Sequence, residues 1–391
     1  VNLGILGLFK YFNFFAESFT DFVHLFGWQV SNPTLQIILP AGISFYTFQT
    51  MSYSLDIYKG QLKPTRHFFD FALFVSFFPQ LMAGPIERAK RLLPQIQNPR
   101  HITANMITEG GWLILWGVFK KVFIADNLAP YSYWSVVTTQ SPTSGDLYIG
   151  YMAFAVQFYC DFSGYSDMAR GLASMMGIKL TLNFNLPYFA TNPAAFWQRW
   201  HITLSSWLRD YCYAPLVRSR LLNGNKSIAL VLTMAIAGFW HGAGWRFILW
   251  GILWGSAMLA YRFLIPTLSH FKNKGKLTRN VLGVIGAIFT FHLWMLVGQF
   301  FVTAEIQLGW NNIVILFSDW SISSYTLFDM KALLYYIWPL VLMQIAQAYS
   351  KNLYIVLTWP YLIRLAVYSI LLFLLITSGA EGGAEFIYFQ F

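Results

Sequence analysis

Residues 239–246 read Phe239-Trp240-His241-Gly242-Ala243-Gly244-Trp245-Arg246, and they belong to a long apolar run from Ile228 to Tyr261. His241 and Arg246 are the only basic or acidic side chains of that run. About 20 apolar residues cross the hydrocarbon of a bilayer, so the run can enter, cross or turn within a membrane. An ionisable group at such depth is costly and therefore indicates a functional site. The alternative is a structural imidazole that caps a helix end.

The same stretch predicts where His241 lies. A helix that starts after Lys226 brings the imidazole about 22 Å into the bilayer at 1.5 Å per residue. Gly242 and Gly244 then permit a turn and a close approach of the backbone. We expect residues 228–245 and 247–265 to form a membrane hairpin with His241 near its far end.

Composition predicts the class of protein around this hairpin. The chain is 57% hydrophobic and 11% charged, whereas soluble domains average about 25% charged residues. Aromatic residues make up 19% of the chain, as expected at membrane interfaces and apolar cavities. We therefore predict an all-α polytopic membrane protein with residues 1–391 forming one membrane domain. Val1 to Phe15 reads as the end of an apolar span, so further membrane helices are expected before it.

The positive charge is concentrated between the apolar spans. The net charge is +10, and basic blocks occupy residues 88–100, 218–226 and 272–279. Basic loops tend to remain in the cytoplasm, so these blocks are expected on the cytoplasmic side. No basic stretch forms a folded domain of its own, which excludes a nucleic-acid-binding module. The two cysteines and seven histidines show no disulfide framework or metal-ligand spacing, so no metal site is expected.

Candidate membrane segments are distributed along the whole chain. They are residues 1–16, 35–55, 68–84, 109–127, 147–162, 228–245, 247–265, 281–302, 333–349 and 362–379. Several are short, are broken by proline and glycine as at residues 40–42 and 79–85, or carry Gln157, Asp161 or His292. Broken membrane segments persist only where protein or a water-filled cavity satisfies the backbone. This pattern favours an internal funnel, and the absence of an internal repeat weakens a transporter interpretation.

Residues 193–213 show a helical pattern that differs from the apolar spans. Pro193 suits an early helical position, and apolar and aromatic residues recur at i, i+3 and i+4 spacing. We expect an amphipathic helix at the membrane interface. His201, Ser205 and Arg209 lie at successive i+4 steps along it. The alternative for His201 is an interfacial side chain that reaches toward water.

Five stretches of the sequence occur in a recognisable order. They read FPQLMAGPIER at 78–88, DFSGYSDMARG at 161–171, FWQRWHITLSSWLRDY at 196–211, WHGAGW at 240–245 and FIYFQF at 386–391. From Asn2 to the last residue the chain resembles the membrane-bound O-acyltransferase (MBOAT) superfamily, in particular its bacterial alginate O-acetyltransferase branch. The resemblance implies a multi-helix bundle with a central funnel or tunnel and interfacial amphipathic helices. It also maps the signature histidine of the family onto His241, and its upstream partner onto His201.

Acetyl transfer to a hydroxyl needs a base, donors for the oxyanion and exclusion of water. His241 is the predicted general base, because burial among Trp side chains favours the neutral imidazole. His201 is expected to orient the reacting group or to stabilise the oxyanion. The remaining candidates for lining the substrate tunnel are Asp161, Ser163, Tyr165, Asp167, Trp200, Ser205, Arg209 and Trp240. A buried strut, with Arg170 as a possible partner, is the alternative for the two carboxylates.

The resemblance implies an O-acetyltransferase of the bacterial cytoplasmic (inner) membrane. Its donor would be a cytoplasmic thioester, acetyl-CoA, with no bound cofactor. The acceptor would be an exported polysaccharide: alginate-like, cellulose or peptidoglycan. Membrane lipid and a separate periplasmic acetyltransferase would be its partners. Two alternatives remain: D-alanyl transfer from a carrier protein to teichoic acid, and a transporter with a His241–Asp161 proton relay.

Overall fold

The computed structural model describes residues 1–31, 34–35, 40, 42–81, 84–132, 142–272, 275–383 and 386. These residues form helices joined by turns and loops, and no strand occurs among them. The all-α prediction is confirmed for this part of the chain.

The helices follow one another closely along the sequence. The first group is α1 (Asn2–Leu6), η1 (Gly7–Tyr11), α2 (Phe12–His24), α3 (Ile43–Tyr58), α4 (Phe68–Ser76), α5 (Phe78–Leu81) and α6 (Ala89–Gln97). The second is α7 (Ala104–Val118), η2 (Phe119–Ala125), α8 (Asp126–Leu128), η3 (Ala129–Tyr131), α10 (Ser144–Met175) and η4 (Pro187–Phe189). Next come α11 (Pro193–Trp197), α12 (Ile202–Leu208), η5 (Arg209–Tyr213), α13 (Ala214–Arg218), α14 (Lys226–His241) and α15 (Trp245–Lys272). The last are α16 (Lys276–Val302), α17 (Ile306–Ser318), α18 (Ser324–Ser350), η6 (Ile355–Thr358) and α19 (Tyr361–Ser378).

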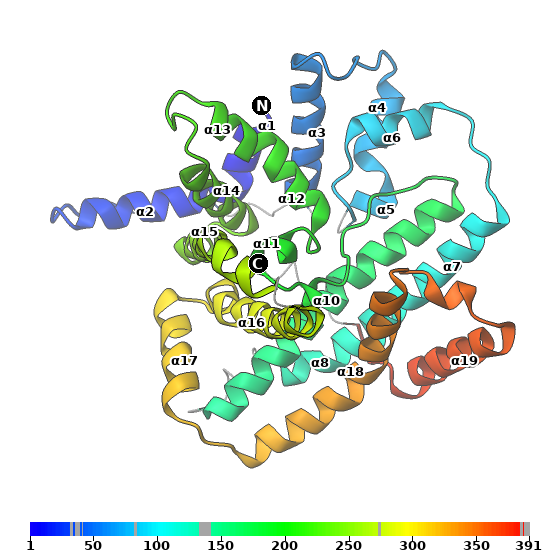
Figure 1. Cartoon of the computed structure of the whole chain (residues 1–391). Coiled ribbons are helices and arrows are strands. Elements are labelled where there is room, and N and C mark those ends of the chain that lie inside the picture. The colour runs from blue at the N-terminus through cyan, green and yellow to red at the C-terminus, as the bar shows by residue number, and fades with distance from the viewer. Residues whose placement is uncertain are drawn as a thin grey trace.

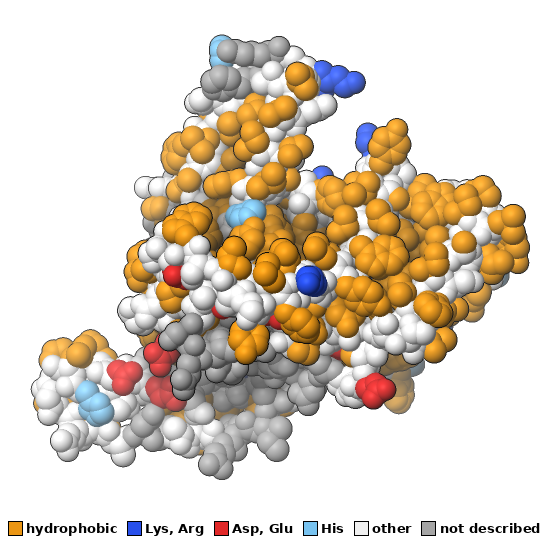
Figure 2. Space-filling model, turned by 90° about the horizontal axis from the view of Figure 1, so that it is seen from below, with side chains coloured by type: hydrophobic (Ala, Val, Ile, Leu, Met, Phe, Trp, Pro, Cys, Tyr) orange, Lys and Arg blue, Asp and Glu red, His pale blue; other side chains and the backbone are white. Residues whose placement is uncertain are grey.

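Four of the described helices are long and apolar enough to cross a membrane: α15, α16, α18 and α19. The hydrophobic helix α14 is shorter. Much of the surface is apolar: the face shown in Figure 2 is covered mainly by hydrophobic side chains, with scattered charges. These features agree with the membrane protein that the composition predicts.

Some predicted segment boundaries differ from the observed ones. Segment 147–162 is part of the much longer α10, and segment 68–84 is divided into α4 and α5. Helix α17 was not predicted at all. Residues 36–39 and 41 of segment 35–55, residues 82 and 83 of segment 68–84, and 387–391 of the last motif lie outside the described residues.

Helix α10 runs through the centre of the molecule, and α7 lies beside it (Figure 1). Glycines allow these two helices to pack closely. A Cβ on Gly117 would lie 2.6 Å from the carbonyl oxygen of Gly164, and a Cβ on Gly171 would lie 2.6 Å from that of Gly110. Only glycine fits at such distances. The close packing that it allows brings polar groups on α7 and η2 against α10.

The hairpin predicted around His241 is present. Helix α14 begins at Lys226, where the Asn225 side chain accepts hydrogen bonds from backbone amides, and it ends at His241. It packs tightly against α15, because a Cβ on Gly238 would lie 1.9 Å from the Phe247 carbonyl oxygen. The predicted start and the turn after His241 are therefore confirmed, whereas the helix ends before the predicted segment boundary at residue 245.

The single interfacial helix predicted for residues 193–213 is wrong. Helix α11 ends at Trp197, and a new helix, α12, begins after His201, whose φ of 42° lies in the left-handed region. The break is held by hydrogen bonds to another segment. The Ile202 amide donates to the Asn183 carbonyl at 2.9 Å, and the Asn185 amide donates to the Arg199 carbonyl at 2.9 Å. Backbone pairing between distant segments therefore replaces the helical bonds that the local pattern predicts.

Two residues at the break between α11 and α12 are deeply buried. Trp200 is 2% exposed and His201 is 0% exposed. The alternative in which His201 reaches toward water is excluded by this burial.

Candidate active site

His241 is the last residue of α14 and is only 7% exposed. Its ring centroid lies 4.9 Å from that of Trp240, 5.3 Å from that of Trp250 and 5.3 Å from that of Phe301. These aromatic residues come from α14, α15 and α16. Three helices therefore enclose one imidazole in an apolar environment that excludes water.

Gly242, the residue after His241, is required by close packing. A Cβ at this position would lie 1.9 Å from the ring of Phe247. The chain then turns, with the Gly244 amide donating to the Gly242 carbonyl at 3.0 Å. The predicted close approach at Gly242 is confirmed, and it allows Phe247 to pack against Phe301 at 5.2 Å between ring centroids.

His201 is held by a hydrogen bond to Asn183. The distance from His201 Nδ1 to Asn183 Oδ1 is 3.0 Å. The same oxygen accepts from the hydroxyl of Thr203 at 2.9 Å and from its amide at 3.4 Å. A backbone amide can only donate, so this oxygen is the acceptor and His201 Nδ1 carries the proton. In the neutral imidazole Nε2 is then an acceptor, and this atom has no hydrogen-bond partner among the described residues.

Asn183 joins three of the sequence motifs. Its side-chain nitrogen donates to Ser166 Oγ at 3.2 Å, in the motif at 161–171. Thr203, which bonds to its oxygen, belongs to the motif at 196–211 and accepts at 3.0 Å from the amide of Ile86, in the motif at 78–88. The network therefore fixes the position of His201 from several directions.

Trp240 lies between the two histidines. Its ring centroid is 6.4 Å from that of His201 and 4.9 Å from that of His241. Phe162 also packs edge-on against His201, with centroids 4.7 Å apart. The structure therefore brings together His201, His241 and Trp240, which the sequence analysis assigned to one site.

Several indole N–H groups on α11, α14 and α15 are buried and have no hydrogen-bond partner within the described part of the chain. They belong to Trp197, Trp240, Trp250 and Trp254. Buried donors are usually paired, so a set of free donors in one region indicates groups available to a ligand. Trp240 and Trp250 contact His241 and are the donors best placed to interact with a group that reacts there.

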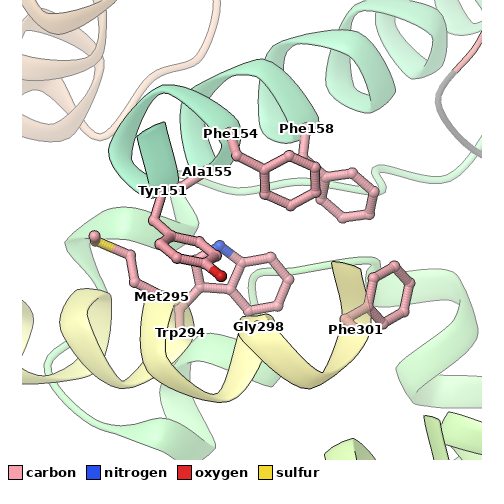
Figure 3. Close-up of a pocket in the computed structure, with 8 residues that line it drawn as sticks. All are labelled: Tyr151, Phe154, Ala155, Phe158, Trp294, Met295, Gly298 and Phe301. Atoms are coloured by element: carbon pink, nitrogen blue, oxygen red, sulfur yellow. The ribbon is translucent and has the colours of Figure 1, made fainter. Parts of the chain in front are cut away.

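Trp200 packs between this centre and a small aromatic cavity. Its ring lies 5.6 Å from that of Phe158, which lines the cavity between α10 and α16 (Figure 3). The lining residues are Tyr151, Phe154, Ala155, Phe158, Trp294, Met295, Gly298 and Phe301. The cavity holds about 10 Å³, which is room for one water molecule at most.

Ser205 and Arg209 line a larger cavity of about 380 Å³. It lies between the α11–η5 region and the hairpin, and its walls are Ala194, Trp197, Gln198, Ile202, Ser205, Ser206, Leu208, Arg209, Tyr213, Leu230, Thr233, Met234 and Met258. Ser205 Oγ donates to the Trp200 carbonyl at 3.2 Å, and Arg209 pairs with Asp210 at 2.9 Å. These contacts do not involve an imidazole, but Ile202, next to His201 in the sequence, is part of the wall.

The four candidates from the motif at 161–171 lie in a different region, which we call the lysine cluster. It consists of Lys120, Lys121, Asp126, Asp161, Ser163, Asp167 and Arg170. Lys121 Nζ lies 2.7 Å from an Asp161 oxygen and 2.8 Å from an Asp126 oxygen. Tyr165, the fourth candidate, lies beside this cluster, with the Lys121 Nζ 5.7 Å from its ring centroid.

The second half of the lysine cluster is centred on Lys120. Its ammonium lies 2.7 Å from an Asp167 oxygen and donates to Ser163 Oγ at 2.9 Å. Arg170 pairs with Asp167 at 3.0 Å, as the sequence suggested, and donates to the Tyr354 hydroxyl at 2.9 Å. Asp161 and Asp167 are therefore paired with cations of the cluster, and their predicted role in lining a tunnel stays a prediction.

Sequence reasoning missed Asn183, Lys10, Lys120 and Lys121. A signal existed for the lysines, because each lies within an apolar segment where an unpaired charge is costly. Asn183 gave no such signal. Among the described residues, no three His, Cys, Asp or Glu side chains gather as a metal site requires.

The profile of the MBOAT, membrane-bound O-acyltransferase family, matches residues 64–304. The chain belongs to this family. It is 39% identical over 325 residues to a probable alginate O-acetylase, AlgI, of Azotobacter vinelandii, which covers 83% of this chain and 63% of the relative. It is 38% identical over 332 residues to the peptidoglycan O-acetyltransferase of Helicobacter pylori, covering 78% and 61%.

A more distant relative transfers a different acyl group. The chain is 30% identical over 245 residues to the teichoic acid D-alanyltransferase of Streptococcus thermophilus, covering 58% of each protein. The chain spans less than two thirds of the length of the relatives that it matches. The matched family region contains both histidines, Asn183 and the lysine cluster.

Proposed function

We propose that this MBOAT protein transfers an acetyl group from a cytoplasmic thioester, acetyl-CoA, to a hydroxyl group for O-acetylation of an exported polysaccharide. The observation that carries the proposal is the pair of buried imidazoles around Trp240, one of which presents a free nitrogen acceptor. Acyl transfer to a hydroxyl needs a base, which we assign to His241, and a group that orients the acceptor, which we assign to His201, in a site that excludes water. The O-acetyltransferases among the relatives support the acetyl group.

In the proposed reaction the acceptor hydroxyl attacks the thioester carbonyl carbon while its proton passes to His241. A C–O bond forms, and the carbonyl oxygen becomes an oxyanion. The indole N–H groups of Trp240 and Trp250 are suited to stabilise it, because they are buried donors beside His241. When the oxyanion collapses, the C–S bond breaks and the thiol leaves with the proton from the imidazolium.

The tautomer of His201 limits the roles that this residue can have in the mechanism. With Nδ1–H bonded to Asn183, the neutral ring has no N–H left for an oxyanion. Its Nε2 can accept a hydrogen bond from a neighbouring hydroxyl of the acceptor sugar and so orient the hydroxyl that reacts. Of the two roles that the sequence suggested for His201, the geometry therefore supports orientation.

The larger cavity is a suitable path for the donor. Its wall includes Arg209 and Tyr213, close in sequence to the basic block at 218–226, and Met234 of the hairpin. Arg209 and the nearby basic block favour the phosphates of acetyl-CoA. Placement in the bacterial inner membrane, with this block in the cytoplasm, is part of the same proposal.

Donor identity can be tested with the purified chain in proteoliposomes. We expect [¹⁴C]acetyl-CoA to give an alkali-labile ester on added polysaccharide, in the presence of a periplasmic acetyltransferase partner if the sugar is not acetylated directly. The matched arm supplies a D-alanylated carrier protein with a teichoic acid acceptor. If only the carrier protein donates label to the acceptor, the protein is a D-alanyltransferase and the proposed acetyl transfer is wrong.

The orientation is tested separately in cells. A single cysteine at Ser219, in the basic loop after α13, is expected to resist a membrane-impermeant thiol reagent until the cells are lysed. Position 273, in the basic block at 272–279, is expected on the same cytoplasmic side, and it lies outside the described residues. Labelling of either position in intact cells would invert the hairpin and remove the cytoplasmic path for the donor.

A further inference from the structure

We propose that Lys10 is a positioning residue that holds the end of α14 and thereby the imidazole of His241. Its ammonium donates to the carbonyl oxygens of Trp240 at 2.7 Å and of His241 at 2.9 Å. These partners lie 230 and 231 residues away in the sequence. The catalytic consequence rests on the function proposed above for His241, whereas the contact itself does not.

The end of α14 shows why such a residue is needed. The last four carbonyls of a helix have no partner within the helix. Here Gly238 receives only a long bond of 3.4 Å from the Gly242 amide. The Phe239 carbonyl accepts from the Tyr11 hydroxyl at 3.1 Å, and those of Trp240 and His241 accept from Lys10. Two adjacent residues of the N-terminal segment therefore satisfy the three carbonyls that precede the glycine turn.

The N-terminal segment is anchored where this contact occurs. Tyr11 stacks on Phe239 with ring centroids 4.3 Å apart, and Leu6 and Ile43 complete a small buried cluster. Lys10 and Tyr11 belong to η1, a π-helical turn, and π-helical turns are frequent at functional sites. Lys10 therefore reaches the carbonyls from a packed element rather than from a loose terminus.

The glycines after His241 make an outside restraint important. Gly242 has no side chain that could hold the turn, and a Cβ on Gly244 would meet only ordinary contacts at 3.6 Å or more. Charge-assisted hydrogen bonds from an ammonium are stronger than neutral ones, and a cation suits the negative end of a helix dipole. A displacement of the base by about 1 Å can cost about 100-fold in rate. Lys10 thus fixes the backbone from which the imidazole projects.

The neighbouring helix end is held in the same way. Arg246 donates to the carbonyl of Phe301 at 2.8 Å and also to that of Thr303, at the end of α16. Phe301 packs against His241. Two cations on separate segments therefore hold the two helix ends that meet at the imidazole.

The test compares Lys10→Met and Lys10→Arg with Lys331→Met, which removes an exposed lysine from α18. We expect Lys10→Met to lower kcat for acetyl transfer by 10- to 100-fold, with the KM for the donor changed less than twofold. Lys10→Arg retains a cationic donor and should recover kcat to within about threefold of the wild type. Lys331→Met should match the wild type.

Hydrogen–deuterium exchange of the peptide 239–246 provides a readout that does not depend on the reaction. We expect faster exchange in Lys10→Met than in Lys331→Met, and Lys10→Gln replaces Lys10→Met if that variant does not fold. Unchanged exchange, or a kcat within twofold of the wild type in folded Lys10→Met, would overturn the proposal. Faster exchange in a protein whose wild type transfers no acetyl group would leave the contact standing and refute the proposed function instead.

Discussion

Two buried regions lie against α10: the histidine centre, which consists of His201, His241 and Trp240, and the lysine cluster. They differ in how their polar groups are paired. Phe162 and Ser166 of α10 belong to the surroundings of His201. Asp161 and Asp167, on other faces of the same helix, pair with Lys121 and Lys120. One helix therefore supports a centre of imidazole and aromatic rings and a cluster made of ion pairs.

The difference lies in which groups remain available. In the lysine cluster each carboxylate lies within 3.0 Å of a cation. In the histidine centre His201 Nε2 and the Trp240 indole N–H have no hydrogen-bond partner among the described residues. Unpaired buried polar groups reduce stability, and in the proposed reaction a substrate completes those beside the histidines. The cluster, in which each carboxylate lies beside a cation, is suited to hold helices together.

The largest expected effect is that of His241→Ala. We expect at least a 1,000-fold loss of acetyl transfer with normal membrane abundance, because the variant removes the proposed base and leaves the surrounding rings in place. The control is His292→Ala; His292 lies on α16, and its imidazole bonds to the hydroxyl of Tyr148 of α10 at 2.9 Å. The measurement is single-turnover transfer from labelled acetyl-CoA. Near wild-type transfer by His241→Ala would show that His241 is not the base.

His201→Ala should cost less, about 100-fold in kcat, because it removes orientation of the hydroxyl and not the base. Asn183→Ala should have part of the same effect, since Asn183 acts through the His201 ring. We therefore expect the double variant to be no slower than His201→Ala alone, measured as a double-mutant cycle on kcat. Fully additive losses would separate Asn183 from His201.

Lys121→Met tests the structural role of the lysine cluster. It leaves Asp126 and Asp161 without the cation that lies within 3.0 Å of both. Breaking a buried ion pair costs about 3 to 5 kcal/mol of stability, so the thermal midpoint in detergent should fall. Activity should fall only as folded protein is lost.

The matched variant also replaces both carboxylates, by Asp126→Asn and Asp161→Asn, and should recover much of the lost stability because no unpaired charge remains. A folded Asp161→Asn protein with a low kcat would contradict the assignment of Asp161 to a structural cluster and would support its role in lining the substrate tunnel. Stability is measured by thermal denaturation, and kcat on the same folded samples.

The smallest effect is expected at Gly298, which lines the aromatic cavity next to Phe301 (Figure 3). A Cβ at this position meets nothing within 4 Å, so Gly298→Ala causes no clash. Alanine in a helix interior is favoured over glycine by about 0.5 to 1 kcal/mol, so stability should rise slightly with transfer unchanged. A loss of transfer in this stable variant would show that the cavity receives part of a substrate.

The parts of the molecule that sequence reasoning predicted well are those set by local pattern. The helix from Lys226 to His241 follows from an apolar run with a clear start and a glycine turn after it. The break at His201 could not be predicted locally. The helical spacing continues through it, and the competing hydrogen bonds come from Asn183 and Asn185.

The candidate site was predicted in the same uneven way. The resemblance gave the two histidines, and ring contacts with Trp240 bring them together. The partners of the histidines were not predicted, because Asn183 and Lys10 act through contacts that no spacing reveals. Asp161 and Asp167 were identified as unusual, but the adjacent lysines of η2 that pair with them were read as part of an apolar span.

The contact between Lys10 and the end of α14 also has a consequence for biosynthesis. The lysine is inserted early, and its carbonyl partners are made 230 and 231 residues later. At about 5 to 20 residues per second, the ribosome needs roughly 10 to 50 seconds to supply them. During this interval the Ser44 hydroxyl, 3.4 Å from the ammonium, is the acceptor of the three that has already been made. Until the two carbonyl contacts form, the end of α14 lacks this restraint, so the proposed catalytic centre is complete only after residue 241 has been synthesised.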